Sequence, residues 1–360
     1  MVYNDETLDF AVKNSGLGPL KRKNQISFLG EGAWHHAYLV STNHTEKFVV
    51  RLPKKVSVYG DKVEYDEKAI HADYRGTQLY YETANTIKAG ICPEFFHYYN
   101  APGKTYTIET YKGPNVKLAD LTSNEAFSIG FQMGEFFREM NKVKHSLKGY
   151  GYLSWNGKEV EGRYQTDVST FMKEENEEYA QDFERVCSWD KRFASDEIKS
   201  KLMDSLASRS IDANTISITN QDASPENILF YNGQVSLIDP FPILYYGHSL
   251  AGNFLNCYET IFPTYFNTKR YERHQFNLYT KELREITNGY LHGYTCGDSH
   301  IKQLVRREQF IRLANLTYDH FVVATGELSK RAEVGMGTRD VINERISVFL
   351  EMLRAFNLDG

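Results

Sequence analysis

Cysteine is scarce in this sequence. The chain of 360 residues has four cysteines, Cys92, Cys187, Cys257 and Cys296, and no two of them form a C-x-x-C pair. Such scattered positions predict neither a zinc site nor a disulfide framework. A reducing compartment, the cytoplasm, is the simplest setting for a protein with this cysteine usage.

Long apolar runs and an excess of positive charge are also lacking. No stretch of about twenty consecutive apolar residues occurs, so we expect no membrane-spanning helix and no membrane partner. The N-terminal segment MVYNDETLDFAVKNSG carries acids and no long apolar run, so we expect no signal peptide in it. With a net charge of −5, the chain as a whole lacks the excess of basic residues that is typical of nucleic-acid-binding proteins, and we expect no nucleic-acid partner. The sequence leaves the oligomeric state open.

The rest of the composition is that of a folded protein. Hydrophobic residues make up 41% of the chain and charged residues 25%, which is enough apolar material for a sizeable core. The length of the chain predicts about two domains or lobes.

One stretch, from Ile218 to Pro240, carries the chemistry. It reads ITNQDASPENILFYNGQVSLIDP, and it contains two short apolar runs, 228–231 and 234–238, joined by Asn-Gly. Asn-Gly between two such runs is a strong signal for a β-hairpin with a two-residue turn. Because the hairpin returns the chain to where it started, we expect Asp222, Asn227 and Asp239 to lie at one end of it.

These three side chains suit phosphoryl transfer. The reaction needs a carboxylate to orient the attacking hydroxyl, and an Asn and an Asp to hold magnesium on the nucleotide phosphates. The spacing D-x-x-x-x-N, followed by a hairpin and an Asp, is that of the kinase catalytic core. We therefore predict that Asp222 is catalytic and that Asn227 and Asp239 bind Mg²⁺. An ordinary turn rich in Asp and Asn is the alternative interpretation.

The chain resembles the aminoglycoside phosphotransferase and choline kinase-like family of small-molecule kinases. The run Asp222-Ala-Ser-Pro-Glu-Asn227 has the D-x-x-P-x-N form of that family, and Leu237-Ile-Asp-Pro240 has its common Asp-Pro. The resemblance implies an α+β protein-kinase-like fold with two lobes, an antiparallel-sheet N-lobe and a mainly helical C-lobe. It also implies ATP or GTP as the nucleotide, with Mg²⁺.

The sequence departs from the family at two places. Asn220 stands where the family usually has His, two residues before the catalytic Asp, and the segment 247–252 lacks the Asp that commonly follows Asp-Pro. An Asn can still donate and accept hydrogen bonds and so hold the loop. The Pro-Glu-Asn run is also similar to protein kinases, but their catalytic-loop Lys would fall at Ser224, and no Ala-Pro-Glu follows.

Upstream, the segment 26–40 predicts a strand, a Gly-x-Gly turn at Gly30 and Gly32, and a returning strand. Glycines let a backbone approach phosphate closely. In kinases the third strand, here 48–52, carries a basic residue that pairs with the phosphates, and Arg51 is the candidate. A simple hairpin and a solvated Arg at the end of a strand are the plainer interpretations.

The predicted helix 64–88 should hold the acid that pairs with Arg51. We choose Glu82, with Glu67 as the rival. The resemblance also implies that 107–114 is the hinge between lobes, whose backbone binds the adenine edge with Glu109 and Tyr111 flanking it. A Gly-Pro pair after a strand suits a domain boundary as well. We therefore predict an N-lobe at 1–111 and a C-lobe at 112–360.

An acidic run lies in the helix-like segment 166–190. Glu174, Glu178 and Asp182 recur every four residues, so they share one face of a helix. In aminoglycoside kinases this segment holds substrate-binding helices, so the acidic face is a candidate site for a cationic acceptor such as an aminosugar. A solvated helix face is the alternative, because charge runs usually are solvated.

These observations together predict a small-molecule kinase. The expected reaction moves the γ-phosphoryl group of ATP to a hydroxyl of an aminoglycoside-like antibiotic or a related metabolite. The alternative is a catalytically silent kinase fold that senses a nucleotide or another ligand, which Asn220, Arg51 and the altered segment 247–252 suggest. A protein kinase is the further rival, against which the missing Lys and Ala-Pro-Glu argue.

Overall fold

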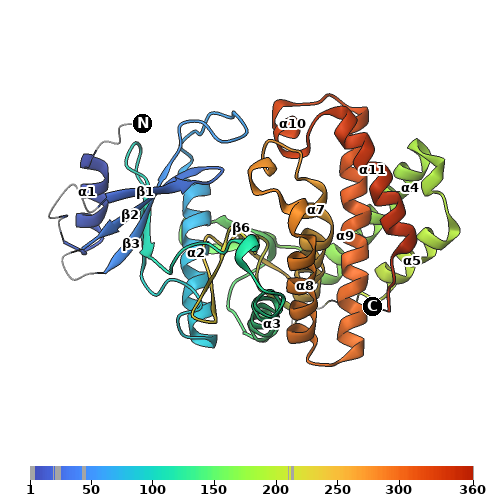
Figure 1. Cartoon of the computed structure of the whole chain (residues 1–360), viewed down its shortest axis with the longest axis horizontal. Helices are drawn as coiled ribbons and strands as arrows, with labels where there is room; N and C mark the ends of the chain where they lie inside the picture. The colour runs from blue at the N-terminus through green and yellow to red at the C-terminus, as the bar shows by residue number, and fades with distance from the viewer. Residues whose placement is uncertain are drawn as a thin grey trace.

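The N-terminal part of the chain is built on one antiparallel sheet. A computed structural model describes residues 5–18, 20, 26–42, 46–209, 211 and 215–359. In it, five strands pair in the order β1-β2-β3-β5-β4 (Figure 1). The strands are β1 (Ile26–Glu31), β2 (His35–Ser41), β3 (Lys47–Pro53), β4 (Phe96–Tyr99) and β5 (Tyr106–Thr110). Helix α1 (Asp5–Asn14) buries Leu8 and Val12 against this sheet.

Helix α2 (Glu67–Ile87) connects the sheet to the rest of the molecule. Asp66 caps its first turn by accepting a hydrogen bond from the N–H of Ala69, which satisfies one of the free donors at the helix start. The middle of the helix buries Tyr80, Tyr81 and Ala84. These side chains join the large apolar core that continues into the helical part, so α2 packs against both parts of the chain.

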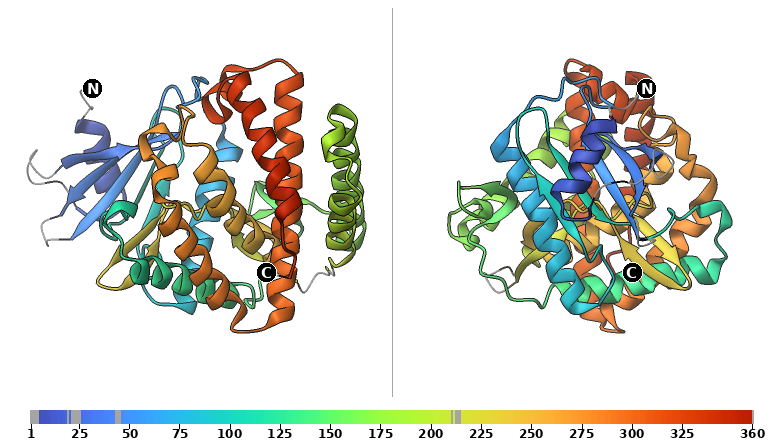
Figure 2. Two further views of the ribbon diagram at one scale, coloured as in Figure 1. Left: turned by 45° about the vertical axis from the view of Figure 1, so that its right-hand side comes forward. Right: turned by 90° about the vertical axis from the view of Figure 1, so that its left-hand side faces the viewer.

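The C-terminal part is mainly helical. Its longer helices stand beside one another, and α4 and α5 lie at the end farthest from the sheet (Figures 1 and 2). The described α-helices of this part, long and short, are α3 (Ser123–Met140), α4 (Val168–Trp189), α5 (Asp196–Ala207), α6 (Gly247–Asn256), α7 (Phe262–Thr264), α8 (Thr280–Thr295), α9 (Ser299–Thr325), α10 (Lys330–Met336) and α11 (Arg339–Ala355). Among the described residues, no helix has both the length and the apolar character needed to cross a membrane.

Two small sheets lie between the two parts. One is the hairpin of β9 (Ile228–Tyr231) and β10 (Gln234–Leu237), and the other has the order β7-β6-β11-β8. The members of the second sheet are β6 (Tyr150–Trp155), β7 (Val160–Tyr164), β8 (Ile216–Asn220) and β11 (Pro242–Tyr246). The predicted α+β class, with a sheet N-lobe and a helical C-lobe, is confirmed. Strand β5 ends at Thr110, and the boundary between residues 111 and 112 stays a prediction.

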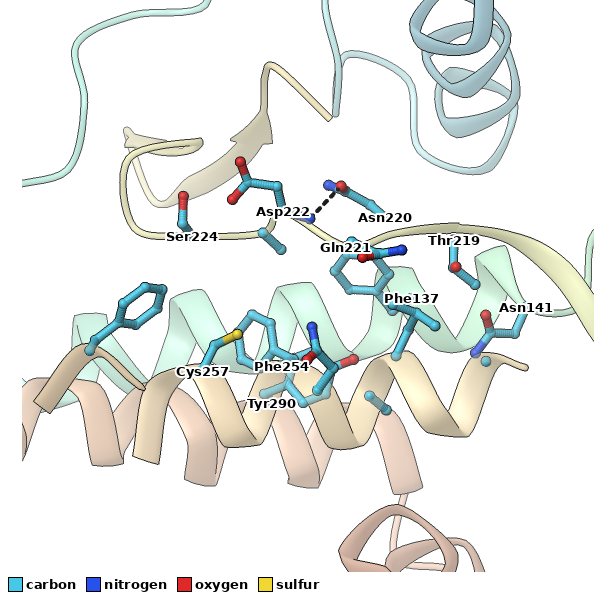
Figure 3. Close-up of a pocket in the computed structure, with 16 residues that line it drawn as sticks. Phe137, Asn141, Thr219, Asn220, Gln221, Asp222, Ser224, Phe254, Cys257 and Tyr290 are labelled. Carbon is cyan, nitrogen blue, oxygen red and sulfur yellow. Dashed lines mark hydrogen bonds between the residues drawn. The ribbon is translucent and has the colours of Figure 1, made fainter. Parts of the chain in front are cut away.

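Glycines allow α3 and α8 to touch backbone to backbone. A Cβ added to Gly134 would lie 2.1 Å from the carbonyl oxygen of Tyr290, and one added to Gly289 would lie 2.0 Å from that of Phe127. Real Cβ atoms do not approach a carbonyl oxygen so closely, so any side chain here would force the helices apart. The contact matters for the site because these two helices lie beneath the loop that carries Asp222 (Figure 3).

We expect Gly134→Ala to destabilise the protein by about 1–3 kcal/mol, the usual cost of overpacking a tight interior. Urea unfolding of the variant, followed by far-UV circular dichroism, measures this loss. Gly335→Ala is the matched control, since Gly335 is also in a helix but its added Cβ would meet only the ring of Tyr59 at 3.8 Å. Equal stability of Gly134→Ala and the native protein would contradict the packing argument.

Candidate active site

The loop that precedes the β9–β10 hairpin and the residue that follows it meet at one place. The predicted hairpin is present, with Tyr231 paired to Gln234 and the turn residues Asn232 and Gly233 at φ 50° and 75°. Positive φ at both turn residues is what the Asn-Gly signal predicts. The N–H of Ile238 then bonds to the carbonyl of Asn227 at 3.0 Å, which brings the segment ending in Asp239 beside the loop.

Asn220 holds this arrangement together. Its Oδ1 accepts hydrogen bonds from two backbone N–H groups, those of Asp222 and Phe241, both at 2.9 Å (Figure 3 shows the first). The side chain is 4% exposed, so both bonds form away from competing water. A single amide oxygen thus ties the loop of Asp222 to the segment after Asp239, so Asn220 supports that loop.

Asn227 and Asp239 could together hold a hard cation. The Asn227 amide nitrogen donates to the backbone carbonyls of Asp222 at 3.2 Å and Asp239 at 3.4 Å, which turns its oxygen away from them. The Asp239 side chain is 53% exposed and lines the cleft between the two parts of the chain. The donor set of one amide oxygen and one carboxylate fits Mg²⁺, which keeps several waters and binds substrate phosphates besides one or two protein ligands.

The acid that pairs with Arg51 is Glu109 on β5. Arg51 Nη2 lies 2.7 Å from Glu109 Oε1, and Arg51 Nη1 lies 3.8 Å from Asp239 Oδ2. Our choice of Glu82 as the partner is wrong, because that side chain is exposed on α2 and meets Arg75 at 3.7 Å. The rival Glu67 is also exposed, at the start of the helix.

We expected Glu109 to flank the adenine edge at the hinge, but it lies buried beside Arg51. Its side chain is 2% exposed and bonded to Arg51 and to the hydroxyl of Tyr81. Burial raises the pKa of Glu109, and the adjacent Arg51 opposes that rise. The predicted neighbour Tyr111 lines the cleft, but its N–H is bonded to the carbonyl of Lys47, so that N–H is not available to an adenine base.

The cleft between the two parts of the chain has a volume of about 570 Å³. Gly30 and Gly32 lie on its wall, and nothing is within 4 Å of where their Cβ atoms would be, so packing does not require glycine there. Lys54 braces this turn, because its ammonium donates to the Gly32 carbonyl and pairs with Glu31 at 3.1 Å. The space left at the two glycines is what close approach of a phosphate needs.

Sequence reasoning missed a group of charged residues on the opposite wall. Glu226, next to Asn227, is bound by Arg270, Arg273 and His274, with nitrogen–oxygen distances of 2.9, 3.0 and 3.1 Å. Burial alone would raise the pKa of Glu226, but His274 and Arg270 lower it to about 2. These contacts fix the end of the loop that carries Asp222 and Asn227 to the segment around η5 (Glu272–His274), which the spacing of the sequence does not reveal.

Asp222 occupies the rim of the loop. Its carboxylate points away from the small apolar pocket beneath the loop, which Phe137, Phe254 and Cys257 help to line (Figure 3). Solvent reaches the side chain, but crowding by protein atoms, together with the charge of Asp239, raises the pKa of Asp222 to about 6. A carboxylate of this basicity is suited to accept a proton from a hydroxyl near neutral pH.

The acidic run on α4 lies elsewhere. Asp182 is buried and pairs with Arg185 at 3.1 Å, whereas Glu174 and Glu178 are exposed. Helix α4 stands at the far end of the helical part (Figures 1 and 2), and none of the three lines the cleft. The interpretation of this face as an acceptor site required it to line the cleft, which it does not, since helical periodicity fixes which residues share a face and not where the face points.

Comparisons with known proteins identify the fold. No protein-family model and no curated protein sequence matches the chain. A solved structure of a thermostable mutant of aminoglycoside phosphotransferase APH(4)-Ia, in a ternary complex with AMP-PNP and hygromycin B, matches with a TM-score of 0.56 and 14% identity, covering 98% of this chain and 99% of that one. Its ternary complex with ADP and hygromycin B matches with a TM-score of 0.54 and 14% identity, covering 94% and 97%. This chain therefore has the protein-kinase-like fold of the aminoglycoside phosphotransferases.

We expect Glu226→Gln to lose stability at neutral pH by about 1.5–3 kcal/mol, the range for hydrogen bonds to charged groups. A carboxyl whose folded-state pKa is depressed stabilises the protein fully above its unfolded value of 4.5, and this contribution is lost as the pH falls toward 2. The gap in thermal midpoint between the native protein and Glu226→Gln should therefore shrink below pH 4.5. Glu272→Gln, at an exposed residue of the nearby η5, is the control. A difference in thermal midpoint that did not change with pH would refute the lowered pKa of Glu226.

Proposed function

We propose that the protein is a phosphotransferase that moves the γ-phosphoryl group of ATP or GTP, with Mg²⁺, to a hydroxyl of a small molecule. The observation that carries the proposal is the meeting of Asp222, Asn227 and Asp239 at one edge of a cleft whose other wall holds Arg51 and two glycines. The fold shared with an aminoglycoside phosphotransferase supports it.

The nucleotide would lie in the 570 Å³ cleft. Apolar side chains on both walls, Val49 from the sheet and Leu229 and Ile238 from the hairpin segment, suit the faces of a purine ring. Its phosphates would extend toward Gly30, Gly32 and Arg51. A Mg²⁺ ion held by Asn227 and Asp239 would neutralise charge on the phosphates.

The chemistry left to the protein is positioning and proton transfer. Asp222 would accept the proton of the acceptor hydroxyl as that oxygen attacks, a role that its raised pKa favours. The guanidinium of Arg51 would attract phosphate oxygens, and Glu109 holds it in place. Such sites accelerate phosphoryl transfer mainly through orientation and fixed charge.

The acceptor would approach beside Phe241. The purine ring of the nucleotide would lie on the opposite side of Asp239. A pocket of about 370 Å³ lies there, lined by Asp73, Tyr152, Trp155 and Arg163 as well as Phe241. The rings of Tyr152 and Phe241 are 43% and 47% exposed, with centroids 5.7 Å apart. Exposed aromatic faces beside charged groups suit a ring-bearing polar compound. With α4 far from the cleft, the acidic run no longer argues for an aminosugar.

We expect Asp222→Asn to keep the fold and nucleotide binding but to lower turnover by about 10²–10⁴-fold, the usual worth of a positioned general base. A panel of hydroxylated compounds with ATP and Mg²⁺, read by ADP release, finds the acceptor and then compares the variants. Asp196→Asn, an exposed change on α5, is the control. Near-native turnover by a folded Asp222→Asn protein would refute the role of Asp222, whereas nucleotide binding without turnover on any acceptor would favour the silent sensor.

A second pair of variants tests the metal. Asp239→Ala should reduce Mg²⁺-dependent nucleotide binding more than Asn227→Ala, because a carboxylate brings a full charge to a hard cation and an amide only a dipole. Calorimetric titration of ADP, with and without Mg²⁺, measures both losses. Equal or reversed losses would mean that the two metal assignments are wrong.

A further inference from the structure

The guanidinium of Arg51, which would face the phosphates of the nucleotide, is held within the sheet. Arg51 is opposite Thr107, and Glu109 is opposite Val49 on the adjacent strands β3 and β5, so the two charged side chains lie diagonally on one face of the sheet. Their ion pair of 2.7 Å joins groups that belong to one rigid hydrogen-bonded unit. The position of Arg51 therefore does not require an acid from α2.

Helix α2 contributes Tyr81 to this cluster instead. The Tyr81 hydroxyl donates a hydrogen bond to Glu109 Oε2 at 3.0 Å and accepts one from the backbone N–H of Asp239, also at 3.0 Å. The side chain is 2% exposed, and burial raises the pKa of Tyr81 well above its ordinary value, so the phenol keeps the proton that it donates. One hydroxyl thus links the arginine–glutamate pair to the peptide group of Asp239.

That peptide group needs support. Asp239 has a φ of 48°, in the left-handed region that non-glycine residues rarely adopt and that costs about 1–3 kcal/mol. The bonds that hold it are the N–H to Tyr81, the Asp239 carbonyl to the Asn227 amide, and the N–H of Phe241 to Asn220. The bonds from Asn227 and Asn220 come from the catalytic loop and its preceding strand, whereas the bond from Tyr81 comes from α2.

We propose that Tyr81 is a positioning residue that fixes Asp239 for the divalent cation, while Glu109 fixes Arg51 for the phosphates. The proposal rests on the proposed function, because it needs Asp239 to be a metal ligand. Without the hydroxyl, the Asp239 N–H loses its partner and the backbone relaxes from φ 48°, which moves the carboxylate. The aromatic ring itself fills the core against Phe96 and is not part of the argument.

Tyr81→Phe tests this inference, because it removes the hydroxyl and keeps the ring. ADP binding is titrated calorimetrically with and without Mg²⁺, so that no acceptor is needed. We expect the affinity for metal-free ADP to be unchanged and the gain in affinity on adding Mg²⁺ to fall by about tenfold, which corresponds to about 1.4 kcal/mol. Tyr106→Phe is the matched control, a buried tyrosine of the same sheet region whose hydroxyl accepts a hydrogen bond from Asn14 at 2.8 Å.

A second variant separates the two halves of the proposal. Glu109→Gln keeps an oxygen that can accept from Tyr81 but removes the charge beside Arg51, so we expect weaker binding of metal-free ADP and a retained Mg²⁺ gain. Loss of the Mg²⁺ gain in Glu109→Gln, or its retention in Tyr81→Phe, would overturn the inference. If Mg²⁺ does not increase the affinity of the native protein for ADP, the metal site of the proposed function is wrong. If Mg²⁺ increases the affinity of the native protein and of Tyr81→Phe equally, only the role of the Tyr81 hydroxyl is wrong.

Discussion

The site depends on one buried amide oxygen. Asn220 Oδ1 accepts from the N–H groups of Asp222 and Phe241, so one side chain joins the loop of Asp222 to the segment that follows Asp239. All five residues of β8 are buried, so the two hydrogen bonds lie at the end of a strand that cannot shift without exposing apolar side chains. Because an unpaired N–H in such a place would cost about 1–3 kcal/mol, the loop has little freedom to open.

Local chemistry made most of the catalytic segment predictable from the sequence. An Asn-Gly turn specifies a tight hairpin whatever surrounds it, and a hairpin fixes how far apart its two ends lie. The meeting of Asp222, Asn227 and Asp239 follows from those rules together with the spacing of the residues. The same is true of the glycine turn at Gly30 and Gly32, whose flanking strands pair directly, with Gly30 opposite Ala37.

The rest could not be predicted, because it depends on which face of an element meets which neighbour. Glu82 and Tyr81 are adjacent on α2, yet one is exposed and the other is buried against Glu109 and Asp239. Glu109 lies on β5, four of whose five residues are buried, and a buried carboxylate needs a cationic or hydrogen-bonding partner. The strand reads Tyr-Thr-Ile-Glu-Thr, which does not mark it as buried, so the sequence alone does not identify Glu109 as the partner of Arg51.

Charge balance around Asp239 connects these features. Glu109 and Asp239 lie beside the guanidinium of Arg51, and the charge of Asp239 also acts on Asp222 and on Asp73 of α2. Crowding by protein atoms, with the charge of Asp239 adding to it, raises the pKa of Asp73 to about 7, just as it raises that of Asp222 to about 6. Carboxylates that hinder each other's ionisation in this way are stabilised by a bound cation. The proposed divalent ion at Asp239 would relieve this repulsion, and the hydrogen bonds that Tyr81, Asn220 and Asn227 make to the backbone around Asp239 hold that residue in place.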